Sequence, residues 1–188
     1  GGSVGVVGYG HIGSMLSDRL RALGIEHRVY DPWLDQQLIN QPASLMEILA
    51  CDVVTLHPEL TREQPWPSFH LLGEGELACL DASCLLINAS RGPVLDNRAL
   101  LRLLLAGRGP VSVLDVWEGE PALDHDLLAQ VRLGTPHIAG YSLDGKLLAT
   151  RMLCEAFGQR LGLAPPRLDS PAGEPAVLAV PAALEGAP

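Results

Sequence analysis

The sequence predicts an α/β domain built on a doubly wound parallel sheet. Short apolar runs rich in β-branched residues alternate with stretches of helical periodicity, and a glycine-rich turn joins the first run to the first helical stretch. Polar clusters follow several of the later runs. The length of 188 residues, with 47% hydrophobic and 19% charged residues, suits one well-packed domain.

The first strand and helix surround the glycine turn. Residues 4–7 form a β-branched run that ends at Gly8, and from Ile12 onward apolar residues recur every three or four positions. Gly24 is typical of a helix C-terminus, and residues 27–30 predict a second strand. Strand, turn, helix and strand in this order are the opening of a parallel sheet.

The alternation continues to residue 161. Apolar runs predict strands at 53–56, 84–87 and 111–116, and a last strand region near 131–133 and 138. Helical patterns predict helices at 45–50, 71–80, 99–105 (with Asp96 as its capping residue) and 146–161. Six of the fifteen prolines then fall within 164–188, without a periodic pattern. We expect one folded domain over residues 1–163 and a Pro/Ala-rich tail or linker over 164–188.

Composition excludes several classes of partner. The formal net charge is −9, and the 13 Lys and Arg residues form no cluster that could bind nucleic acid. No apolar run approaches the roughly 18 to 20 residues of a membrane span, and the opening residues carry no signal-peptide pattern. The four cysteines lack CxxC spacing, which is typical of a reducing compartment. We therefore expect a cytoplasmic protein.

The glycine turn matches the pattern GxGxxG at residues 8–13. Such a match alone is weak, but this one follows a predicted strand and opens a helix, and Asp31 ends the second strand 18 positions after Gly13. Gly8 would allow the tight turn, Gly10 the approach of a pyrophosphate, and Gly13 close helix packing. Asp31 would bind ribose hydroxyls and repel a 2′-phosphate. The sequence thus predicts an NAD-binding Rossmann fold that prefers NAD to NADP.

Three polar segments follow later strands, at residues 88–93, 115–121 and 135–141. The carboxyl ends of parallel strands meet at one edge of a sheet, where ligands bind. Arg91 could hold a substrate carboxylate, His137 could take a hydroxyl proton, and a glutamate could orient the imidazole. Taken singly, the arginine could be a surface ion pair and the histidine a structural residue. Together, behind the glycine pattern, they favour a site that oxidises a small anionic 2-hydroxy acid.

The motifs together resemble the D-isomer-specific 2-hydroxyacid dehydrogenases over about residues 3–162. The glycine pattern, NASRGPVLDN at 88–97, DVWEGEP at 115–121 and TPHIAGYS at 135–142 follow in that family's order. The resemblance implies NAD as cofactor and a homodimer for the full-length protein. It also implies a further, substrate-binding domain that is largely absent from this chain.

The resemblance also implies a role for individual residues. The implied catalytic residues are Arg91, Glu120 and His137, with Glu118 as a bystander. Asp31 would hold the ribose and Asp115 the nicotinamide carboxamide. The full set of implied cofactor contacts is Gly8, Gly10, His11, Ile12, Gly13, Asp31, His57, Pro58, Ser90, Asp115 and Gly140, and the implied substrate contacts are Tyr141 and Lys146.

Some alternatives stay open at this point. The family's usual His-x-Pro-Leu segment is here His57-Pro58-Glu59-Leu60, so the proline replaces a residue that often contacts the cofactor. Lys146 could bind a substrate phosphate or cap the last helix. The acid could be another 2-hydroxy acid such as phosphoglycerate, or the chain could be a catalytically silent NAD-binding module. We expect no metal, because the adjacent residues 124–126 cannot easily converge on one ion.

Overall fold

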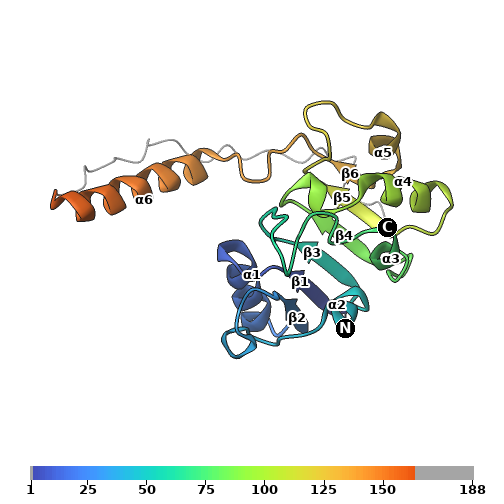
Figure 1. Cartoon of the computed structure of the whole chain (residues 1–188), viewed down its shortest axis with the longest axis horizontal. Helices are drawn as coiled ribbons and strands as arrows, with labels where there is room; N and C mark the ends of the chain where they lie inside the picture. The colour runs from blue at the N-terminus through green and yellow to red at the C-terminus, as the bar shows by residue number, and fades with distance from the viewer. Residues whose placement is uncertain (1, 164–188) are drawn as a thin grey trace, which may run out of the picture. The chain divides into compact units, whose positions relative to one another are not determined.

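The computed structural model describes residues 2–163 and confirms the doubly wound parallel sheet (Figure 1). Six parallel strands lie in the order β2-β1-β3-β4-β5-β6. The order reverses at β1, which lies between β2 and β3, and such a switch point is where open α/β sheets bind ligands. The strands are β1 (Val4–Val7), β2 (His27–Tyr30), β3 (Val53–Leu56), β4 (Leu85–Asn88), β5 (Val111–Leu114) and β6 (Leu133–Gly134).

The chain divides into two compact units, one up to Gly140 and one from Tyr141 onward. The first unit holds the whole sheet, and the second contains helix α6 within the described residues. The tail predicted at 164–188 lies outside the described residues. The helices are α1 (His11–Ala22), α2 (Leu45–Leu49), α3 (Glu74–Leu77), α4 (Asn97–Leu105), α5 (His125–Gln130) and α6 (Leu143–Leu161), with short 3₁₀ helices η1 (Gln36–Leu38) and η2 (Gly92–Val94).

The two faces of the sheet carry separate apolar cores. Successive side chains of a strand point to opposite faces, so Val6 and Val7 of β1 belong to different clusters. Val6 packs with Leu20 of α1 and with Val29 of β2. Val7 joins the larger cluster beneath α2, α3, α4 and α5. Figure 1 shows α1 on one side of the strands and α3 and α4 on the other, as a doubly wound sheet requires.

Two predicted helix boundaries are confirmed by their capping contacts. The Asp96 side chain accepts a hydrogen bond from the Ala99 amide at 2.9 Å, and α4 begins at the next residue, Asn97. Gly24 follows α1 in the left-handed region, with φ of +67°, where glycine is unstrained. Both contacts are local, which is why the sequence alone predicts them.

Two predicted elements differ from the structure, and one helix was not predicted. The helix expected at 71–80 shrinks to Glu74–Leu77, because Leu72 pairs with Leu95 as an isolated parallel bridge instead of joining a helix. The last strand covers only Leu133–Gly134, and the Ile138 amide donates to the Asp115 carboxylate instead of to a strand. Helix α5 was not predicted; the Asp124 carboxylate caps it.

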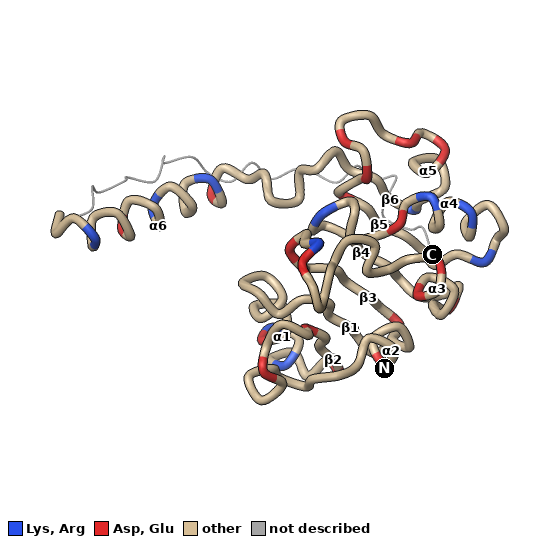
Figure 2. The backbone as a smooth tube through the Cα atoms, in the orientation of Figure 1, with Lys and Arg blue, Asp and Glu red and all other residues tan. Residues whose placement is uncertain are grey.

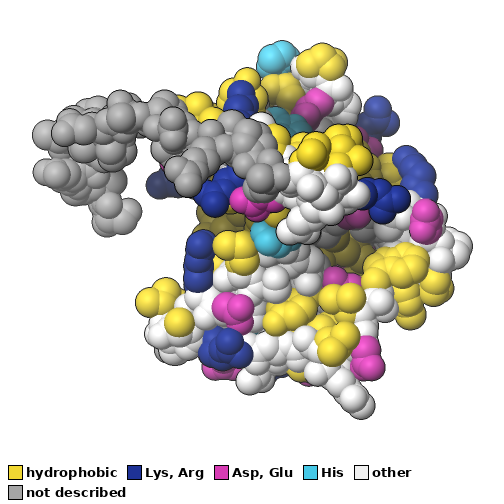
Figure 3. Space-filling view, turned by 90° about the vertical axis from the view of Figure 1, so that its left-hand side faces the viewer, with side chains coloured by type: hydrophobic (Ala, Val, Ile, Leu, Met, Phe, Trp, Pro, Cys, Tyr) yellow, Lys and Arg dark blue, Asp and Glu magenta, His cyan; other side chains and the backbone are white. Residues whose placement is uncertain are grey.

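The surface carries both signs of charge. Basic residues lie on α1, α4 and α6 and in loops, interspersed with acidic ones (Figure 2). The face drawn in Figure 3 likewise shows apolar, acidic and basic side chains side by side. Among the helices of residues 2–163, none combines the length and the apolar character needed to cross a bilayer.

Candidate active site

The glycine turn forms a cradle that larger residues would fill. Gly8 has a φ of +90°, and a methyl group there would lie 2.7 Å from the backbone nitrogen of Pro58. A methyl group on Gly13 would overlap the carbonyl of Gly8, so α1 can pack against the turn only with glycine at position 13. Around Gly10 there is open space, as the approach of a ligand requires.

The N-terminus of α1 is a favourable place for an anion. Gly10 precedes the helix as its cap, and the first turn contains no acidic side chain. The first amide groups of a helix point outward and carry partial positive charge, so they favour phosphate groups. His11 and Ile12, both expected cofactor contacts, are exposed at this end of the helix.

Asp31 lies beside the glycine turn, where the sequence pattern places it. Its Oδ2 accepts a hydrogen bond from the Tyr9 amide at 2.8 Å and its Oδ1 accepts one from the Trp33 amide at 3.0 Å. Each carboxylate oxygen can accept a further bond, so the group is held in place and still able to bind hydroxyls.

A cavity of about 620 Å³ opens between the glycine turn, β2 and the segment after β3. His57 and Pro58 line it with Asp31, and Trp33 and Trp66 add aromatic surface. Burial lowers the pKa of His57, whose Nε2 lies 3.0 Å from the Thr55 hydroxyl. The glycine cradle, the N-terminus of α1 and this cavity together fit a dinucleotide. The role of Asp31 toward its ribose stays a prediction.

The segment carrying Ser90 and Arg91 is fixed by a buried asparagine. Asn88, the last residue of β4, accepts hydrogen bonds from the amide and hydroxyl of Ser90 and donates one to the Arg91 carbonyl at 3.1 Å. Ser90 is therefore buried, while the Arg91 guanidinium is exposed and donates to the Ser90 carbonyl at 2.7 Å. This bond uses one of the five N–H donors of Arg91.

Glu120 and His137 form a pair at the neighbouring strand ends. His137 Nδ1 lies 2.8 Å from Glu120 Oε2, while Glu120 Oε1 accepts from the Trp117 amide at 2.7 Å. The carboxylate accepts the Nδ1 proton, which leaves Nε2 of a neutral His137 with its lone pair. The His137 side chain is 48% exposed, so Nε2 can meet a ligand. This is the arrangement of a general base and its orienting carboxylate.

Asp115 holds the loop that carries His137. Its carboxylate accepts hydrogen bonds from the Thr135 hydroxyl and from the Ile138 and Ala139 amides, and its carbonyl accepts one from the His137 amide at 2.7 Å. Burial alone would raise the pKa of Asp115, but these hydrogen bonds and the nearby His137 outweigh it and lower the pKa. His137 itself is held at a φ of +56°, an uncommon value for a residue other than glycine.

Arg91, Glu120 and His137 follow β4, β5 and β6, which are neighbours in the sheet and parallel. The structure therefore brings the three segments to one edge. Gly140, also expected at the cofactor, ends the first unit in open space.

The two expected substrate contacts belong to the second unit. Tyr141 is exposed, and Lys146 lies in the first turn of α6 with its Nζ 3.4 Å from the centre of the Tyr141 ring. Their roles stay predictions.

From the sequence, His70 is expected to be a surface or helix-end residue, and the structure gives it a long-range partner. His70 Nε2 lies 2.8 Å from Glu118 Oε1, so the half-buried Glu118, expected to be a bystander, has a partner within the protein. The two residues lie 48 positions apart, and no local pattern could have joined them.

The chain matches the family "D-isomer specific 2-hydroxyacid dehydrogenase, NAD binding domain" over residues 1–139. It is 46% identical over 164 residues to an erythronate-4-phosphate dehydrogenase of Cellvibrio japonicus, covering 87% of this chain and 43% of that protein. It is also 46% identical over 162 residues to an erythronate-4-phosphate dehydrogenase of Yersinia enterocolitica, covering 85% of this chain and 43% of that protein.

Solved structures agree with the fold. The chain superposes on a D-lactate dehydrogenase of Aquifex aeolicus, complexed with NAD and lactic acid, with a TM-score of 0.68 at 28% identity. The superposition covers 85% of this chain and 54% of that one. The chain spans less than half the length of the curated relatives it matches.

Proposed function

The chain belongs to the D-isomer-specific 2-hydroxyacid dehydrogenases, as their NAD-binding domain, and on this premise we propose that it serves the oxidation of 4-phospho-D-erythronate. The product is 2-oxo-3-hydroxy-4-phosphobutanoate, and the reaction belongs to the synthesis of pyridoxal phosphate. The similarity of the chain to erythronate-4-phosphate dehydrogenases supports this substrate. The observation that carries the proposal is the contact between Glu120 and His137. These residues follow β5 and β6, next to the strand that Arg91 follows.

The reaction removes a proton from the 2-hydroxyl group and a hydride from C2. His137 Nε2 takes the proton of the 2-hydroxyl group while the C2–O bond becomes a carbonyl. Bound NAD supplies the acceptor for the hydride that leaves C2. Glu120 keeps the proton of His137 on Nδ1 and stabilises the imidazolium that forms.

Arg91 acts on the other end of the hydroxy acid. Its planar guanidinium can bind a carboxylate through two parallel hydrogen bonds, which fixes the position of C2. Hydrogen bonds of the Asn88 side chain hold the backbone of Ser90 and Arg91, from which that guanidinium extends. Arg91, after β4, thus positions the substrate, and His137, after β6, removes the proton.

We further propose that the protein works in the cytoplasm as a homodimer. All four cysteines, at positions 51, 79, 84 and 154, are free, which suits a reducing compartment. The dimer rests on the family resemblance, and sedimentation of the full-length protein tests it.

The test combines cofactor binding with turnover. Calorimetric titration of the chain should give tighter binding of NAD than of NADP. In the whole protein, His137→Gln should reduce NADH formation from 4-phospho-D-erythronate on the order of a hundredfold while leaving NAD affinity unchanged. Faster turnover of phosphoglycerate than of 4-phospho-D-erythronate would make phosphoglycerate the substrate. NAD binding without turnover of any hydroxy acid would leave the silent module as the function.

A further inference from the structure

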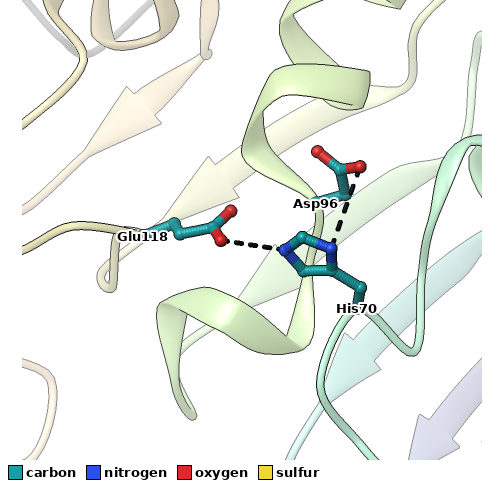
Figure 4. A group of neighbouring side chains, drawn as sticks. All are labelled: His70, Asp96 and Glu118. Atoms are coloured by element: carbon teal, nitrogen blue, oxygen red, sulfur yellow. Dashed lines mark hydrogen bonds and ion pairs between the residues drawn. The ribbon is translucent and has the colours of Figure 1, made fainter.

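Three side chains from distant parts of the sequence meet beside the proposed site. His70 Nε2 lies 2.8 Å from Glu118 Oε1, and His70 Nδ1 lies 4.0 Å from Asp96 Oδ2 (Figure 4). Each ring nitrogen faces a different carboxylate, but only the contact to Glu118 is short enough for a hydrogen bond. A metal ion would take only one of these nitrogens, so we interpret the group as a hydrogen-bonded connection between loops.

Contacts other than the bond to Glu118 also orient the imidazole of His70. Its ring stacks on the Phe69 ring, with the centroids 4.0 Å apart and the planes at 17° to each other. The Arg62 guanidinium in turn lies 3.4 Å from the centroid of the Phe69 ring. The His70 amide donates to the Pro93 carbonyl at 2.7 Å. His70 also adopts a φ of +50°, a conformation that persists only where the surroundings impose it.

Glu118 is anchored at its other atoms as well. Its amide donates to Asn97 Oδ1 at 3.1 Å, and its Oε2 accepts from the Asn97 amide at 3.4 Å. The preceding residue, Trp117, donates its amide to Glu120 Oε1. The position of the backbone at residues 117 and 118 therefore determines where the Glu120 carboxylate lies.

Resting on the proposed function, we infer that His70 is a positioning residue for the Glu120–His137 pair. Its bond to Glu118 ties residues 117–120 to the segment that precedes α3, and this keeps Glu120 Oε2 at the Nδ1 of His137. The consequence is chemical, because Glu120 selects the Nδ1–H form of His137 and thereby leaves Nε2 able to take a proton.

The tautomer of His137 provides the test. Nitrogen NMR of the imidazoles in the 188-residue chain, above the pH range in which histidine titrates, measures the ratio of the Nδ1–H to the Nε2–H form. His70→Asn cannot place a donor at the former Nε2 position, and should lower this ratio for His137 about fivefold, as expected for the loss of one ordinary hydrogen bond. His70→Gln can place its amide there and should restore the ratio.

Matched measurements separate positioning from general destabilisation. Glu118→Ala removes the other partner and should lower the ratio as His70→Asn does, while the amide protons of β4 exchange as slowly as in the wild type. An unchanged ratio in His70→Asn and Glu118→Ala would overturn the inference, as would an equal loss in His70→Asn and His70→Gln. The measurement needs neither NAD nor a hydroxy acid, so it stands apart from any failure of the proposed function.

Discussion

Gly92 lies so close to the backbone of Trp117 that a methyl group on Gly92 would overlap the Trp117 carbonyl. Gly92 follows Arg91, and Trp117 donates its amide to Glu120. This contact therefore sets the distance between the segment that carries the arginine and the turn that carries the carboxylate. Backbone meets backbone here, and no side-chain rearrangement can relieve an added atom.

We expect Gly92→Ala to destabilise the protein by about 1–3 kcal/mol, the usual cost of overpacking. Urea unfolding followed by circular dichroism measures this change. Gly75→Ala is the control, because Gly75 lies in α3 with open space around it, and alanine favours a helix over glycine. Equal stability of the two variants would contradict the close packing.

Asp31 should control the choice between NAD and NADP. Asp31→Asn keeps the shape of the side chain but removes its charge, so NAD binding should weaken roughly tenfold or more while NADP binding improves. Calorimetric titration with both nucleotides measures the two changes. Asp35→Asn is the matched control, since Asp35 caps η1 in the same loop. A parallel loss of affinity for both nucleotides would instead indicate a damaged loop.

His57 should make the protein less stable in mildly acidic solution. Burial lowers its pKa in the folded state, so below about pH 6.5 the unfolded chain binds a proton that the folded chain does not. The free energy of unfolding should therefore fall from about pH 6.5 down to the lowered folded pKa. Urea midpoints across this range, compared between wild type and His57→Gln, should show a smaller slope in the variant. Identical slopes would assign the pH dependence to other groups.

The sequence contains most of what builds the glycine cradle and the strand order. Gly8, Gly10, Gly13 and Asp31 stand in one contiguous βαβ unit, so spacing alone predicts where they meet. Strands β1 and β3 are found at the predicted residues for the same reason. The information is local, and local patterns carry it.

Long-range pairing is what the sequence could not show. The apolar spacing from Leu71 to Leu80 is helical, yet Leu72 forms a bridge with Leu95 that ends the pattern. The bond between His70 and Glu118 is equally remote in the chain. The role of Asp115 at the nicotinamide stays a prediction, and its bonds to the Ile138 and Ala139 amides, more than 20 positions away, follow from no local pattern.

Asp115 should therefore matter for folding of the His137 loop, whatever it contributes to cofactor binding. In Asp115→Asn one carboxylate oxygen becomes an amide that can no longer accept, so either the Ala139 amide or the Thr135 and Ile138 donors lose their partner. We expect a loss of about 1–3 kcal/mol at neutral pH. Because the folded pKa of Asp115 is lowered, its contribution is present above the ordinary value and disappears as the pH falls through the folded value. Urea unfolding of wild type and variant should thus show a gap at pH 7 that narrows in acid. A gap that stays constant would mean that the carboxylate charge has no part in holding the loop.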